Sequence, residues 1–330
     1  MIKVKGDGKM SILVSVILII LGFAFLIKGA DFLVDGASGI AKKFHIPEII
    51  IGLTIVSIGT TMPELIVSVS SAIRGSSDMA IGNVIGSNVC NMLLILGVVS
   101  VIKSIEFKKE TRTIEIPLLL VFTIIFTVIC NTGTGVTKNE AIILLALFIM
   151  FILYTIIMAR KALEFAKEEK EEFPQERTKK QSLFKNIFNI LIGIIILKIG
   201  GDLTVDNAVV IAEKFNISEK IIGLTILAVG TSLPELVTGI TATIKGNSDI
   251  GIGNIIGANI FNMLLITGIT ATINPIVYNT TYNIQIIILI LAIFMIALFP
   301  VIPPKNEMSR GNGITYLIWY VIYIIILFNI

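Results

Sequence analysis

The sequence predicts an all-α polytopic membrane protein with ten transmembrane helices, arranged as two inverted five-helix repeats. Three observations lead to this prediction. The 330 residues are 55% hydrophobic and 15% charged, with a mean hydropathy of +0.94, which is outside the range of soluble domains. Ten apolar stretches are long enough to cross a bilayer. The two halves of the chain also repeat each other, and each half holds five of these stretches.

One charged segment divides the predicted spans into two groups of five. The spans are residues 11–40, 47–73, 79–102, 114–131, 139–160, 184–212, 218–244, 250–273, 283–302 and 313–330. The expected organisation is a short N-terminal tail (1–10), a first repeat (11–160), a charged linker (161–183) and a second repeat (184–330). The linker mixes both signs of charge and contains a proline, which is typical of a solvated connection that is helical in part.

The repeat is visible when the chain is shifted by 171 residues against itself. IGLTIVSIGTTMPEL, from Ile51, then aligns with IGLTILAVGTSLPEL, from Ile222, at ten identical positions of fifteen. IGNVIGSNVCNMLL, from Ile81, aligns with IGNIIGANIFNMLL, from Ile252, at ten of fourteen. Five spans per repeat make the second copy enter the membrane in the opposite direction. Inverted repeats with interrupted helices indicate a midplane site and alternating access, which is transporter rather than channel architecture.

A carboxylate stands at the centre of each first motif. Glu64 and Glu235 lie in apolar spans, where an ionisable group costs roughly 2.5–3.5 kcal/mol on insertion scales. Pro63 and Pro234 precede them, and a proline must bend or break the helix and free the carbonyl four residues earlier. With the neighbouring hydroxyls this is an all-oxygen set, which suits a hard cation such as Ca²⁺ or Na⁺. The alternative is a kinked helix whose buried glutamate is held by hydrogen bonds alone. The hydroxyls belong to Thr60, Thr61, Thr231 and Ser232.

The second motif adds a polar stripe on the next span. Asn83, Ser87 and Asn91 are four residues apart, so they share one helix face, and Asn254, Ala258 and Asn262 repeat this spacing. Either stripe can face the two glutamates. The alternative is that the amides only join helix to helix. Glycines at small-xxx-small spacing in the same motif are expected to let a neighbouring helix approach closely.

The loop charges predict an orientation. With the N-terminus outside, the inside loops carry 17 Lys and Arg residues and the outside segments carry seven. The positive-inside rule therefore predicts a multi-pass protein of the cell membrane with both termini outside and the charged linker in the cytoplasm. Asp31 and Asp202, near the ends of the first and sixth spans, are expected to anchor helix ends or loops rather than to contact ions.

The sequence contains no signals for zinc binding, a disulfide or ATP-driven pumping. His45 is the single histidine, and Cys90 and Cys130 lie in apolar spans, so neither a zinc site nor a disulfide is predicted. There is no Walker-type GxxxxGK[ST] motif, which argues against an ATP-driven pump. We expect no enzymatic activity, no resident cofactor, no nucleic-acid partner and no obligatory protein partner. The expected partners are the lipid bilayer and the transported ions.

With these motifs the chain resembles the calcium/cation antiporter superfamily, and in particular sodium/calcium exchangers of the prokaryotic type. The resemblance implies ten helices in two inverted repeats, with a cluster of sites for Ca²⁺ and Na⁺ at the centre. It implies that Glu64 and Glu235 are shared carboxylate ligands, that Thr60 and Thr231 give backbone carbonyls to Ca²⁺, and that Ser57 and Ala228 give backbone carbonyls to Na⁺. The implied side-chain contributors are Thr61, Ser232, Ser87, Asn91 and Asn262.

Two positions depart from the commonest family pattern. Ala258 stands where many members have serine, and Asn262 stands where many have aspartate. These changes remove a hydroxyl ligand and a third ionisable group, so the coupling ion is open, with Li⁺ and H⁺ as alternatives to Na⁺. The proton-coupled branch typically has GNxxE, whereas this chain has GNVIG and GNIIG, which favours Na⁺. Ca²⁺/Na⁺ antiport is therefore the first hypothesis, Ca²⁺/H⁺ antiport the second and a cation channel the third.

Overall fold

The computed structural model describes residues 12–172, 182–215, 228–299 and 306–329. The first half of the chain contains α1 (Ile12–Phe44), α2 (Glu48–Ile51), η1 (Gly52–Val56), α3 (Ser57–Thr60), α4 (Met62–Ile73), α5 (Ser77–Val89), η2 (Cys90–Ile95), α6 (Leu96–Ile102), β1 (Ile105–Glu106), η3 (Thr111–Glu115), α7 (Ile116–Asn131), β2 (Gly135–Val136) and α8 (Lys138–Glu172).

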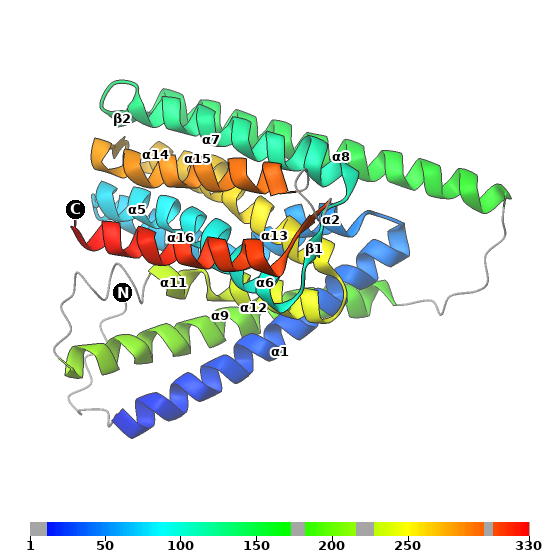
Figure 1. Ribbon diagram of the computed structural model, residues 1–330, viewed down its shortest axis with the longest axis horizontal. Coiled ribbons are helices and arrows are strands. Elements are labelled where there is room, and N and C mark those ends of the chain that lie inside the picture. The colour runs from blue at the N-terminus through cyan, green and yellow to red at the C-terminus, as the bar shows by residue number, and fades with distance from the viewer. Residues whose placement is uncertain (1–11, 173–181, 216–227, 300–305, 330) are drawn as a thin grey trace.

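The second half repeats this order. Its elements are α9 (Leu183–Lys214), α11 (Ala228–Thr231), α12 (Leu233–Ile244), α13 (Ser248–Ile260), η5 (Phe261–Ile266), α14 (Thr267–Ile273), β3 (Ile276–Val277), η6 (Thr280–Tyr282), α15 (Asn283–Leu298), β4 (Glu307–Met308) and α16 (Arg310–Asn329). The helices of both halves run along the long axis of one bundle (Figure 1).

The architecture is that of a helical, multi-pass membrane protein. Among the described residues, eight helices are long and apolar enough to span a membrane, and nine if a bent pair is counted as one span. The bent pair is Glu48–Thr60 with Met62–Ile73, and its two parts meet at 49°. The predicted span 218–244 lies partly outside the described residues, which contain α11 and α12 from it. The predicted tail 1–10 and residues 173–181 of the linker also lie outside them.

One helix runs much further than its predicted span. Residues 139–160 were the expected span, but α8 continues to Glu172, and its end projects beyond the rest of the bundle (Figure 1). Ala, Leu, Glu and Lys dominate this extension, and all four are strong helix formers. The first part of the charged linker is therefore helical.

The helices differ greatly in burial. The α13–η5–α14 helix is 94% buried along its most apolar window and the α5–η2–α6 helix 78%, so these two form the centre of the bundle. The corresponding values are 22% for α1 and 28% for α9, which cross each other at one side of the bundle (Figure 1). Glycines let the two backbones touch at this crossing: a Cβ on Gly22 would lie 2.9 Å from the Gly200 carbonyl oxygen, and one on Gly29 would lie 2.9 Å from that of Gly193.

In the described residues, four π-helical segments interrupt the α-helices, and periodicity alone did not predict them. Two of them, η2 and η5, lie at matching places in the two halves and contain Asn91 and Asn262. Hydroxyls accompany the wider turns, because Thr267 Oγ1 donates to the Asn262 carbonyl 3.0 Å away and Ser57 Oγ to the Gly52 carbonyl 2.7 Å away. Such π-turns occur frequently at functional sites.

Two short antiparallel ladders connect loops of the two halves. Strand β1 pairs with β4, with Ile105 opposite Met308, and β2 pairs with β3, with Val136 opposite Ile276. The ladders lie at opposite ends of the bundle (Figure 1). They join segments far apart in sequence and hold the halves against each other at both ends.

Candidate cation site

Each half of the chain has a helix break beside a glutamate. Thr61 separates α3 from α4, and Ser232 separates α11 from α12. Pro63 and Pro234 lie in the first turn of the following helix, where the missing N–H costs no hydrogen bond. The breaks thus lie where these prolines predict them.

The two breaks meet in the interior of the bundle. Glu64 and Glu235 lie in the first turns of α4 and α12, and both have 0% exposed surface. Ser232 Oγ donates to Glu64 Oε1 across 3.3 Å, so the break in the second half reaches the carboxylate of the first. Ser232 lies directly before α12, whose first turn holds Glu235, so this bond also places Glu235 near Glu64. The fold therefore brings both predicted glutamates to one place.

Most oxygens of this centre lack a protein donor. In the described part of the chain, Glu64 Oε2 and both carboxylate oxygens of Glu235 make no hydrogen bond, and no basic side chain pairs with either group. Ser87 Oγ and both amide atoms of Asn91 are likewise buried without a partner there. A buried, uncompensated carboxylate costs several kcal/mol. A cation or a proton must therefore offset the charge, and the all-oxygen set suits a hard cation.

The hydroxyls of the first break point to other groups. Thr60 Oγ1 donates to Asn254 Oδ1 at 2.9 Å, and Thr61 Oγ1 donates to the Ser57 carbonyl at 2.7 Å. The first of these bonds joins the first break to α13, and the second lies within the first half. In the second half, Thr231 is half-buried at the end of α11, and Ala228 begins that helix.

The amides of the polar stripes divide into two groups. Asn83 Nδ2 donates to Ser68 Oγ at 3.0 Å, and Asn262 Nδ2 donates to Asn88 Oδ1 at 3.0 Å, so these amides join helix to helix. Of the two amide atoms of Asn262, Nδ2 is therefore paired and Oδ1 has no partner among the described residues. Asn91, its equivalent in the first half, keeps its whole amide group unpaired there. The sequence alone does not distinguish these two asparagines.

Close glycine packing holds α13 against the first break. A Cβ on Gly253 would lie 2.4 Å from the Ile49 carbonyl oxygen, and one on Gly257 would lie 2.2 Å from Ser57 Oγ. Distances this short exclude any side chain at either position without movement of the neighbour. The expected small-xxx-small packing is present for this pair and brings Asn254 next to Thr60.

One polar residue near the site was not predicted. Thr238 is fully buried on α12, and its hydroxyl has no partner among the described residues. It lies three residues after Glu235, and residues at this spacing share a helix face. That spacing was the sequence signal that could have identified it.

Comparison with known proteins identifies the family of this chain. The family model described as "Sodium/calcium exchanger protein" matches residues 14–157 and 185–329, which include both glutamates. The chain belongs to the sodium/calcium exchanger family. Members of this family are membrane transporters that exchange cations.

The family assignment covers nearly the whole chain. Inner membrane protein YrbG of Escherichia coli (strain K12) is 34% identical, over 93% of this chain and 94% of its own length. Sodium/calcium exchanger MaX1 of Methanosarcina acetivorans is 30% identical, over 97% of this chain and 100% of its own. A structure of the sodium-calcium exchanger NCX_Mj soaked with Na⁺ and Sr²⁺ superposes with a TM-score of 0.81 at 29% identity, covering 95% of this chain and 99% of that chain.

Proposed function

We propose that this family member exchanges Ca²⁺ for Na⁺ by alternating access, with both ions using one buried site between the repeats. The observation that carries the proposal is the meeting of Glu64 and Glu235, one from each half, with oxygens that no protein donor satisfies among the described residues. Two carboxylates balance one Ca²⁺ or two monovalent cations. A site that the two kinds of ion must share is the basis of antiport.

The proposed ligands come from both halves. Glu64 and Glu235 bind whichever ion is present, and the unpaired Ser87 hydroxyl and Asn91 amide complete the oxygen set. The backbone carbonyls of Thr60 and Thr231 contribute to Ca²⁺, and those of Ser57 and Ala228 to Na⁺. Further side-chain contributions come from Thr61, Ser232 and Asn262.

We propose ten spans in two inverted repeats, divided at the linker 161–183, with residues 218–244 as the seventh span. The crossing of α1 and α9 supports this arrangement, because adding 171 to Gly22 gives Gly193 and subtracting it from Gly200 gives Gly29. The Gly22–Gly200 contact is thereby converted into the Gly193–Gly29 contact, and both are present. The same shift converts β1 into β3, and a shift of 172 converts β2 into β4, so the ladder at one end of the bundle corresponds to the ladder at the other.

We also propose a cell-membrane location with both termini outside and the linker in the cytoplasm. The loop charges support this orientation, with 17 basic residues on the inner side against seven on the outer. The N-terminal tail 1–10 then lies outside.

Proton coupling is the second candidate, because a buried carboxylate without a donor can also bind a proton. Na⁺ is favoured because MaX1 is named a sodium/calcium exchanger and NCX_Mj a sodium-calcium exchanger. Both sequences align with nearly the whole of this chain.

Uptake of radioactive Ca²⁺ into proteoliposomes tests the coupling ion. The vesicles are loaded in turn with Na⁺, Li⁺ or K⁺, or are given a proton gradient with no Na⁺ present. Uptake driven by internal Na⁺ supports the proposal. Uptake driven only by the proton gradient replaces Na⁺ with H⁺, and uptake that needs no counter-ion indicates a channel and overturns antiport.

A further inference from the structure

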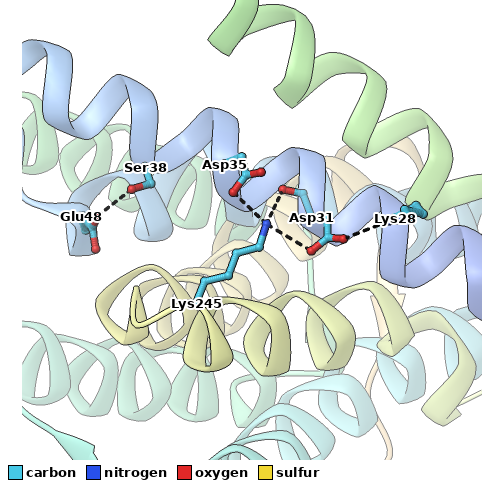
Figure 2. A network of polar contacts seen from close by, with 6 residues as sticks. All are labelled: Lys28, Asp31, Asp35, Ser38, Glu48 and Lys245. Carbon is cyan, nitrogen blue, oxygen red and sulfur yellow. Dashed lines mark hydrogen bonds and ion pairs between the residues drawn. The ribbon is translucent and has the colours of Figure 1, made fainter. Parts of the chain in front are cut away.

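A second cluster of charges, away from the central site, joins α1 to the turn between α12 and α13. Lys245 ends α12, and its Nζ lies 2.7 Å from Asp35 Oδ1 and 3.1 Å from Asp31 Oδ1 (Figure 2). The same nitrogen donates to the Asp31 carbonyl at 3.1 Å. Nearby, Ser38 Oγ donates to Glu48 across 2.9 Å and holds α1 to α2. Asp31 thus anchors the turn after α12, although it lies within α1, which continues to Phe44, and not at the end of the helix.

Lys245 remains charged in this setting. Burial alone lowers the pKa of a lysine, but the hydrogen bonds and charges of Asp35 and Asp31 outweigh burial here and raise the pKa of Lys245 above its usual value. The cation is about one-quarter exposed, at 27% of its side-chain surface. Lys245 and the two aspartates therefore form an ion-paired cluster at neutral pH, at the edge of the bundle.

The helix that this cluster holds belongs to a peripheral pair. Backbone contacts at Gly22, Gly29, Gly193 and Gly200 join α1 tightly to α9. The most apolar windows of both helices are largely exposed, in contrast to the buried centre formed by α5–α6 and α13–α14, whereas the part of α1 from Gly29 to Ala41 is mostly buried. Buried apolar side chains of α1, among them Leu33 and Ala37, also pack in one cluster with Leu233 of α12, so the ion pair at Lys245 adds a polar contact to an apolar interface.

The other half of the chain carries the same three charges. Shifting by 171 residues converts Asp31 into Asp202, Asp35 into Asp206 and Lys245 into Arg74, with the sign of charge kept at every position. This second set is not assembled in the described residues. Asp202 pairs there with Lys198 of its own helix at 2.5 Å, and Arg74 is exposed and makes no ion pair. The three charges around Lys245 are therefore paired with one another, whereas the three corresponding charges around Arg74 are not.

We propose that the two sets form a reciprocal clamp: Lys245 with Asp31 and Asp35 holds the present conformation, and Arg74 with Asp202 and Asp206 holds the opposite one. The inference rests on the proposed alternating access between inverted repeats. A partly exposed ion pair changes a two-state ratio by roughly twofold to fivefold. Such a clamp can bias the conformational equilibrium without locking it, and a transporter must be able to leave both states.

The test measures a distance between spin labels in full-length protein in liposomes. Cysteines replace Lys43 on α1 and Lys109 in the loop before η3, both exposed, and alanine replaces the two buried native cysteines. We expect two distance populations. Lys245→Met should reduce the population of the present conformation roughly twofold to fivefold, Arg74→Met should increase it by a similar factor, and the double variant should return towards the parent ratio.

Controls separate the clamp from a static anchor. Lys245→Arg keeps the charge and should leave the ratio unchanged, and Asp35→Asn removes one of the two negative charges beside Lys245 and should shift the ratio in the same direction as Lys245→Met, by less. If Lys245→Met fails to fold, Asp35→Asn and Arg74→Met carry the test. Two populations that none of these variants shifts overturn the clamp and leave alternating access intact. A single population under all Na⁺ and Ca²⁺ conditions overturns the clamp together with the proposed mechanism.

Discussion

Ser232 Oγ donates a hydrogen bond to Glu64 Oε1 across 3.3 Å, although 168 residues separate the two in the chain. Each belongs to a helix break beside a proline, and the bond joins the break of one half to the carboxylate of the other. A cation at this point therefore contacts both halves at once. Its binding and release are thereby coupled to their relative position.

The paired carboxylates give the first prediction. Glu64→Gln or Glu235→Gln should each reduce Ca²⁺ transport to background, because either change keeps the side-chain shape but removes one of the two charges that balance a divalent ion. The measurement is Na⁺-driven Ca²⁺ uptake, with insertion checked by the yield of monodisperse protein. Glu213→Gln, on the exposed end of α9, is the matched control and should transport normally. Full transport by either site variant would remove the basis of the proposed site.

Glycine packing gives the second prediction. Gly253→Ala should destabilise the protein by about 1–3 kcal/mol, as overpacking typically does, because the new Cβ would lie 2.4 Å from the Ile49 carbonyl oxygen. Thermal unfolding in detergent measures the effect. Gly251→Ala, on the same helix, is the control, since its Cβ would lie 3.3 Å from the nearest atom. Equal melting temperatures for the two variants would contradict the close approach.

The inverted arrangement gives the third prediction. A cysteine replacing Glu164, in the exposed extension of α8, should react with a membrane-impermeant reagent only from the cytoplasm. One replacing the C-terminal Ile330 should react only from outside, because five spans separate the two positions. The native cysteines are buried, which keeps the background low. Reaction of both positions from the same side would require an even number of spans and would refute the inversion.

The fold class and the two helix breaks could be predicted from the sequence because both depend on local chemistry. Apolar stretches of spanning length leave few alternatives to a membrane helix, and Pro63 and Pro234 cannot continue a helix that precedes them, although each fits the first turn of the next one. The π-turns could not be predicted in this way. The turn at η1 involves the Ser57 hydroxyl, which contacts the Gly52 carbonyl at 2.7 Å and the Asn254 carbonyl of α13 at 3.2 Å, and the second of these contacts depends on distant packing.

For the site, too, local chemistry could be predicted from the sequence and distant packing could not. Glu64 and Glu235 could be identified because a buried charge is costly and needs a partner. Asn91 and Asn262 stand in nearly identical motifs, yet Asn262 donates to Asn88 and Asn91 is unpaired among the described residues. The two asparagines therefore differ in their hydrogen bonding although their motifs are nearly the same. A repeated sequence does not contain that asymmetry.

This asymmetry gives the fourth prediction. Asn262→Asp removes the amide that donates to Asn88 Oδ1 and places a carboxyl group there. When protonated, the new group can still donate to Asn88. When ionised, it faces another oxygen and adds a third negative charge near the site. Ca²⁺ transport by this variant should therefore decrease as the pH rises through the pKa of the new group, whereas transport by the parent should not show this step. Identical pH profiles of the flux would contradict the role assigned to the Asn262–Asn88 bond.

The central claim is that Ca²⁺ and Na⁺ compete for one site formed by Glu64 and Glu235. Equilibrium binding of radioactive Ca²⁺ to the purified protein, with choline replacing Na⁺ to keep the ionic strength constant, tests it most directly. Na⁺ should displace Ca²⁺ from the parent protein, and Glu64→Gln and Glu235→Gln should each abolish Ca²⁺ binding. Ca²⁺ binding that is independent of Na⁺, or that persists in both variants, would contradict it.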